Sequence, residues 1–206
     1  MFLNRYDAGK QLAEKLRVYA GVQSVVVALP RGGVVVGYEI ARSLGCPLDI
    51  VVTRKVGYPG NPEYAILAVD SEGSVLTNIT ETERVDRAWL ERETEKQREE
   101  AVRRIKVFRG NRLPVSLSGK TVILVDDGVA TGLTIRLAIR TVKKEKPARI
   151  VVAVPVCPPD VAALLKKEAD EFLVLEDPRE FSGSVGAHYK AFEQVEDDEV
   201  IRLLHS

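Results

Sequence analysis

The chain has 206 residues, 45% of them hydrophobic, and its 30 basic and 30 acidic side chains balance. That apolar content argues against disorder and the length fits one domain, while the balanced charge argues against a nucleic-acid partner. Two distant cysteines, Cys46 and Cys157, favour buried free thiols in a reducing compartment. Charges come too early for a secretory signal, and no apolar run approaches the ~18 residues of a membrane span. We therefore expect a cytoplasmic protein with no membrane partner.

The first quarter of the chain predicts a βαβ unit. Apolar residues at helical spacing predict a helix over 7–20, and the β-branched run at 24–29 predicts a buried strand. A helix over 34–44 follows and is ended by Gly45 and Pro47. A second buried strand is predicted over 48–53, so the two strands are expected to be parallel.

The middle of the chain predicts a loop, a small hairpin and a long helix. Turn residues crowd the segment 54–64, which we expect to be a loop, and a hairpin is expected around Asp70–Gly73. The highly charged stretch over about 81–107 has no Pro or Gly and carries i,i+4 ion pairs, so it predicts one long helix. Its middle, 92–100, is polar on all sides and indicates solvated surface more than a partner-binding helix.

The second half of the chain repeats the alternation of strands and helices. Strands are predicted over 121–125, 148–156 and 171–175, with a helix over 134–144 and another beginning at the prolines near 158. A tail with a glycine-bearing loop and a short final helix follows. This order predicts an α/β fold with a mainly parallel, twisted sheet flanked by helices.

Polar groups follow three of the predicted strands. Pro30-Arg31, Arg54-Lys55 and Asp126-Asp127 each come directly after a buried run. Because ligands of such sheets bind beyond the carboxyl ends of the strands, we expect these groups to converge on one crevice.

The stretch V-I-L-V-D-D-G-V-A-T-G-L-T at 122–134 carries the strongest functional signal. Its loop joins a strand to a helix start, where free N–H groups and the helix dipole favour a phosphate. Gly132 permits close approach, and Thr131 and Thr134 add hydroxyl donors. Asp126 and Asp127 would repel a bare phosphate, so they suit ribose hydroxyls or Mg²⁺. An acid-capped strand end with an ordinary helix start is the alternative, but the complete order favours a sugar-phosphate site.

With these residues in view, the chain resembles the type I phosphoribosyltransferases, whose thirteen-residue motif for phosphoribosyl pyrophosphate (PRPP) is similar to 122–134. The segments F-x-N-R-Y-D-A-G, A-L-P-R-G-G-V-V-V-G, T-R-K-V-G-Y-P-G-N-P-E-Y-A and V-G-A-H-Y-K-A-F-E-Q-V resemble a bacterial and archaeal group with no settled base substrate. The resemblance implies one domain with a Rossmann-type core over about 1–155, a small C-terminal hood over about 156–206, and a homodimer.

The resemblance also implies a role for each segment. Asp126 and Asp127 bind the ribose hydroxyls and belong to the catalytic set. They are also the Mg²⁺ ligands that the resemblance implies, whether direct or indirect. The 5′-phosphate is held by Ala130, Thr131, Gly132, Leu133 and Thr134. The pyrophosphate is held by Arg31, Gly32, Gly33, Arg54 and Lys55, of which Arg31, Arg54 and Lys55 belong to the catalytic set. A non-proline cis peptide is expected at Pro30–Arg31. The mobile loop over 56–64 contributes Glu63 and Tyr64, and the acceptor is lined by Val156, Phe181, His188 and Tyr189.

Some of these roles have plain alternatives. Arg54-Lys55 is also compatible with a solvated pair at a strand end, and 56–64 with an ordinary surface loop. His188 is a candidate to donate a hydrogen bond to a base, but a lone histidine is more often a surface or supporting residue. Ala130 stands where purine-salvage members have Asp, which argues against a hypoxanthine or guanine acceptor, and Leu67 stands where this group has Gly.

Two functions follow from the resemblance. The first is Mg²⁺-dependent transfer of 5-phosphoribosyl from PRPP to a nitrogenous base or related acceptor, with release of pyrophosphate. The alternative is a non-catalytic PRPP sensor that regulates RNA, DNA or a protein partner. The arginines and the closing loop favour catalysis, because a sensor has less need of a lid.

Overall fold

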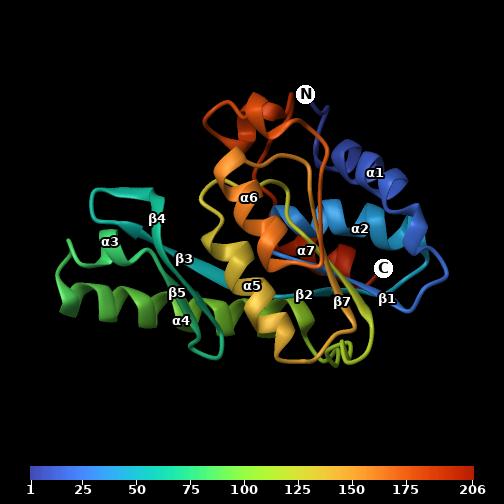
Figure 1. The fold of residues 1–206 in the computed structure, drawn as a ribbon. Coiled ribbons are helices and arrows are strands. Elements are labelled where there is room, and N and C mark those ends of the chain that lie inside the picture. The colour runs from blue at the N-terminus through green and yellow to red at the C-terminus, as the bar shows by residue number, and fades with distance from the viewer.

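Five parallel strands form the central sheet of the protein, which a computed structural model describes over residues 1–206 (Figure 1). The sheet has the order β2-β1-β6-β7-β8, and every neighbouring pair is parallel. The prediction of an α/β fold with a mainly parallel sheet is confirmed. The strands are β1 (Ser24–Ala28), β2 (Leu48–Ile50), β6 (Thr121–Val125), β7 (Arg149–Val154) and β8 (Glu171–Val174).

Helices cover both faces of this sheet because successive side chains of each strand point to opposite faces. Val26 and Ala28 of β1 pack with α1 (Arg5–Lys15), α2 (Gly32–Leu44) and α7 (Asp197–Leu204). Val25 and Val27 pack with α5 (Leu133–Lys143) and α6 (Pro159–Glu168) on the other face. The α1 helix is shorter than predicted and is followed by a 3-10 turn at Arg17–Tyr19.

A second, antiparallel sheet replaces most of the loop expected over 54–64. It consists of β3 (Thr53–Tyr58), β4 (Asn61–Asp70) and β5 (Val75–Thr77). The turn residues that suggested a loop lie at the tip and at a register shift. Gly60 has a positive φ of 83° in the turn, and a Cβ on Gly57 would lie 2.2 Å from the carbonyl oxygen of Pro62. The segment is therefore a hairpin with an irregular tip.

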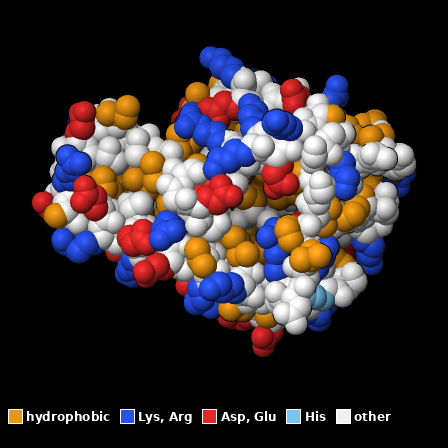
Figure 2. All heavy atoms as spheres, turned by 90° about the horizontal axis from the view of Figure 1, so that it is seen from below, with side chains coloured by type: hydrophobic (Ala, Val, Ile, Leu, Met, Phe, Trp, Pro, Cys, Tyr) orange, Lys and Arg blue, Asp and Glu red, His pale blue; other side chains and the backbone are white.

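The charged stretch expected as one helix over about 81–107 is divided into α3 (Ile79–Thr82) and α4 (Arg87–Arg109). The division arises at Asp86, whose side chain accepts a hydrogen bond of 2.8 Å from the Trp89 N–H and so begins a new helix. With the hairpin, α3 and the first part of α4 project from the body on the left of Figure 1, while the end of α4 lies against the body. Acidic and basic side chains are interspersed over this projection in Figure 2.

The C-terminal tail folds back over the N-terminus. Phe2 forms a β-bridge with Tyr189, the Phe2 N–H donates to the His188 carbonyl at 2.8 Å, and the Lys190 N–H donates to the Phe2 carbonyl at 2.9 Å. The tail also contains 3-10 turns at Pro178–Glu180 and Val185–His188. Both cysteines are free, and none of the helices has the length and apolar composition to cross a membrane.

Candidate active site

The crevice lies where the chain reverses its direction of travel across the sheet. From β1 the chain moves outward to β2, and it returns to β6 on the other side before continuing to β7 and β8. Loops leave β1 and β6 in opposite directions at this point, which opens a binding crevice at their carboxyl ends. Arg31-Gly32-Gly33 follows β1 and Asp126-Asp127 follows β6, so the structure brings these two predicted motifs together.

Glycine is required where the two motifs meet. A Cβ on Gly32 would lie 1.8 Å from Oδ2 of Asp127, and a Cβ on Gly33 would lie 3.0 Å from the Cα of Asp126. The preceding Pro30–Arg31 peptide is cis, as the resemblance implies. The pair of glycines therefore lets the β1 loop press directly against the acidic pair.

Two runs of backbone N–H groups without backbone partners open into this region. One run extends from Ala130 to Ile135, at the start of α5, and the other from Arg31 to Gly33, at the start of α2. Gly132 caps α5 with a φ of 77°, a conformation that favours glycine. Free N–H groups and a helix dipole stabilise anionic oxygens, so each run is suited to a phosphate group.

The acidic pair is electrostatically asymmetric. Oδ2 of Asp127 accepts a hydrogen bond of 2.6 Å from Nε of Arg5, and these side chains are only 16% and 12% exposed. Asp126 has no cation of its own, and its Oδ1 accepts from the Asp127 N–H at 2.9 Å. Burial, followed by the neighbouring Asp127 carboxylate, raises the pKa of Asp126 well above 3.8. One acid thus pairs with a guanidinium, whereas the other has a raised pKa and no cation beside it.

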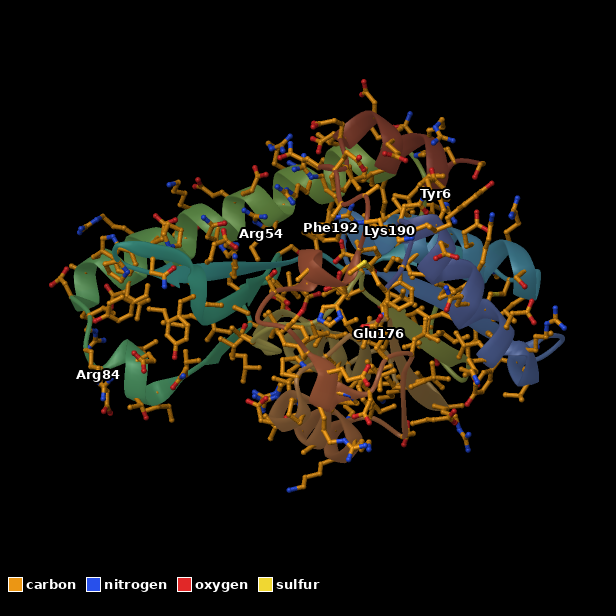
Figure 3. The ribbon with its side chains drawn as sticks, turned by 90° about the horizontal axis from the view of Figure 1, so that it is seen from above. Tyr6, Arg54, Arg84, Glu176, Lys190 and Phe192 are labelled. Atoms are coloured by element: carbon orange, nitrogen blue, oxygen red, sulfur yellow. The ribbon has the colours of Figure 1, made fainter.

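Arg5 was not predicted as a site residue. Its Nη1 donates to the Glu193 carbonyl at 2.7 Å, and its guanidinium lies 3.7 Å from the centroid of the Phe192 ring. Figure 3 shows Phe192 in the C-terminal tail. The resemblance drew on N-R-Y-D but gave Arg5 no role, because nothing in sequence links it to an acid more than a hundred residues later.

The two predicted pyrophosphate cations of β3 have different surroundings. Arg54 is half-buried beside α4 (Figure 3), and its Nε donates to Oε1 of Gln97 at 3.1 Å. The expectation that the middle of the charged helix is entirely solvated is therefore wrong at Gln97. Lys55 instead pairs with Glu63 across the hairpin, with Nζ 2.7 Å from Oε2. The structure places Lys55 and Glu63 with each other, whereas Tyr64 lines a cavity with Ala130 and Thr131.

The residues expected to face the acceptor mostly fill the hood. Val156 and Tyr189 are buried in one cluster with Phe2 and Ala8, and Phe181 packs against it. The Tyr189 hydroxyl donates to the Asp127 carbonyl, and burial raises its pKa, so it stays a donor. These side chains support the acidic loop from behind.

His188 is likewise engaged inside the hood. Its Nε2 accepts from the Ser182 N–H at 3.1 Å, which leaves the proton on Nδ1 to donate to Glu176. Phe181 stacks on its ring at a centroid distance of 5.3 Å. A hydrogen bond from His188 to a bound base would need one of these contacts to break.

Comparisons with known proteins find similarity over most of the chain. Residues 3–190 match the family model described as the phosphoribosyl transferase domain. Two curated proteins from strains of Mycobacterium tuberculosis, provisionally named phosphoribosyl transferases, are 39% identical over 206 residues. That match covers 99% of this chain but 46% of each relative, so the chain spans about half their length.

Solved structures share the fold. TT1426 from Thermus thermophilus is 44% identical, with a TM-score of 0.79 and coverage of 98% of this chain and 97% of that chain. A hypothetical protein from Neisseria gonorrhoeae with bound ppGpp has a TM-score of 0.50 at 20% identity, over 98% and 91% of the two chains, a likeness that extends to the fold alone. The match to the family model over most of its length shows that the chain belongs to the phosphoribosyl transferase family.

Proposed function

We propose that the chain transfers 5-phosphoribosyl from PRPP to a nitrogenous base or related small acceptor, with Mg²⁺ and with release of pyrophosphate. The observation that carries the proposal is the contact of the R-G-G loop with the acidic pair, flanked by the two runs of free N–H groups. A ligand with a phosphate at one end, hydroxyls in the middle and a pyrophosphate at the other end matches this order of groups.

The roles follow from the chemistry of each group. The N–H groups of Ala130–Thr134 would hold the 5′-phosphate, and Asp126 and Asp127 would accept hydrogen bonds from the ribose hydroxyls. The N–H groups of the Arg31-Gly32-Gly33 loop, with Arg54, would bind the pyrophosphate. As the bond from the anomeric carbon to the pyrophosphate oxygen breaks, these N–H groups and the Arg54 guanidinium would stabilise the charge that develops on the leaving group. An acceptor nitrogen held on the opposite face of the ribose then forms the new bond with inversion.

The donor set fits Mg²⁺ carried in with the substrate. The structure has no group of three or more acidic, His or Cys side chains able to hold a metal, and Arg5 already engages Asp127. Mg²⁺ commonly binds to one or two carboxylates together with substrate phosphates, and Asp126 and Asp127 would be those carboxylates. The ion would supply charge neutralisation of the leaving pyrophosphate.

The acceptor is proposed only as a class. Ala130 is exposed at the loop and offers no carboxylate to a purine, while the half-buried apolar residues of the hood include Phe181 and Val185. The hairpin that carries Tyr64 would serve as the closing lid. The homodimer and the cytoplasmic location expected from the sequence stay predictions.

The experiment is a calorimetric titration of PRPP into the protein with Mg²⁺, beside the double variant Asp126→Asn/Asp127→Asn. The exposed Asp198→Asn is a matched control with the same chemical change outside the crevice. We expect binding to wild type and control and none to the double variant. A panel of bases assayed for pyrophosphate release then separates an enzyme from a PRPP sensor. A folded wild type that does not bind PRPP, with or without a base, would overturn the proposal.

A further inference from the structure

Four arginines from three elements gather beside the R-G-G loop, and the proposed function uses only two of them. Arg31 precedes α2, Arg54 lies on β3, and Arg103 and Arg104 lie near the end of α4. Burial lowers the pKa of Arg54 most, followed by the positive charge of Arg104, whereas the negative charge of Glu100 opposes this shift. Arg54 has a neutral partner, Gln97, and no carboxylate. The cluster therefore holds a half-buried cation that makes no ion pair of its own, with Glu100 as the acidic side chain that acts on it.

The helical spacing turns Arg104 toward this cluster. Gln97, Ala101, Arg104 and Phe108 recur at the intervals of one helix face, and Ala101 and Phe108 are fully buried in the body. Arg104 is accordingly only 14% exposed, whereas Arg103 beside it is 51% exposed. Glu100 accepts a hydrogen bond of 2.7 Å from Nε of each of these two arginines, which presents them side by side.

A carboxylate of the chain itself already lies between two members of the cluster. Oδ1 of Asp197, at the start of α7, is 3.4 Å from Nη1 of Arg31, and its Oδ2 is 3.7 Å from Nη2 of Arg103. These separations are longer than those of a strong charge-assisted hydrogen bond. Asp197 is thus a weakly held anion in a position that links the R-G-G loop to α4.

We propose that α4 supplies a second wall of the pyrophosphate site, in which Arg104 and Arg103 bind the pyrophosphate group of the ligand together with Arg31 and Arg54. Asp197 occupies part of this site until the ligand arrives, and the ligand displaces it. The inference rests on the proposed function for the identity of the ligand, but the cluster's preference for a pyrophosphate over a single phosphate can be measured on its own.

The test is calorimetric titration with Mg²⁺ and two probes, inorganic pyrophosphate and ribose 5-phosphate. R104Q should weaken pyrophosphate binding about tenfold, the equivalent of one charge-assisted hydrogen bond, and leave ribose 5-phosphate within about twofold. R103Q should have a smaller effect in the same direction because its side chain is half-exposed. R98Q, on the same helix and paired with Glu95, is the matched control and should change neither affinity.

D197N provides a variant whose expected effect cannot come from misfolding. Removal of the competing carboxylate should tighten pyrophosphate binding about threefold, as expected for loss of a partly exposed ion pair. If R31Q abolishes pyrophosphate binding while R104Q and D197N match wild type, this inference falls and the proposed function stands. If pyrophosphate binds with the expected dependence on Arg104 but PRPP does not bind, the inference stands and the proposed function falls. A wild type that binds neither probe would overturn both.

Discussion

Replacement of Arg5 by Gln should destabilise the protein as well as its site. The Arg5–Asp127 ion pair is neither deeply buried nor exposed, with 12% and 16% of the two side chains accessible. Loss of one partner costs about 3–5 kcal/mol in a fully buried pair, whereas exposed pairs contribute about 0–1 kcal/mol, so we expect about 2 kcal/mol here. At this chain length, that loss corresponds to a Tm lower by about 4–8 °C.

A double-mutant cycle with Asp127→Asn measures the pairing itself. Arg5→Gln, Asp127→Asn and the double variant would be unfolded with urea at pH 7, and we expect a coupling of about 1–2 kcal/mol, above the ~0.5 kcal/mol typical of independent sites. The matched control is Arg17→Gln, which removes an exposed ion pair with Glu14 and should change Tm little. Additive losses from Arg5→Gln and Asp127→Asn would refute the view that Arg5 stabilises the acidic pair.

Three further variants test the site. Gly32→Ala should cost about 1–3 kcal/mol of stability and abolish PRPP binding, because the new Cβ would lie 1.8 Å from Oδ2 of Asp127. An unchanged Tm in thermal melts and an unchanged affinity in calorimetry would contradict this expectation. The pKa of Asp126 is raised above 3.8, so above that pH the native state holds more protons than the unfolded state and loses stability as pH rises. The stability of Asp126→Asn relative to wild type should therefore increase with pH. A difference in the free energy of urea unfolding that does not change with pH would contradict this reasoning. His188→Asn should lower Tm but leave the Kd for PRPP within about twofold, since both ring nitrogens bond inside the hood, and a large loss of affinity without loss of Tm would show that His188 contacts ligand.

The parallel sheet and the two loops at its crevice were predictable because their signals are local. A β-branched run followed by R-G-G or D-D fixes both the strand and the group at its end. The β3–β4 hairpin was not predicted because Pro59, Gly60 and Pro62 indicate turns wherever they stand, and only the pairing of β3 with β4 confines them to the tip. The division of the charged helix at Asp86 depends on a single capping contact, which a run of helix-forming residues conceals.

The parts of the site that sequence did not predict arise from contacts between distant segments. Arg5 reaches Asp127 because the tail residues Phe192 and Glu193 hold its guanidinium in place. Tyr189 was expected to face an acceptor, but the β-bridge to Phe2 buries it behind the acidic loop. No spacing rule along the chain carries such information.

The contact of Arg5 in α1 with the tail residues Phe192 and Glu193 has a consequence for how the protein folds during synthesis. A growing chain can pair β1, β6 and β7 well before it is complete, and domains generally begin to fold from the N-terminal side. The backbone acceptor for Arg5, however, lies 188 residues later, at Glu193. Helix α1 must therefore wait until the residues around Glu193 have been made before Arg5 is held against the acidic loop. Closing so long a loop is slow, so the sheet would exist before the crevice acquires its final charge arrangement, and ligand binding would report the end of folding.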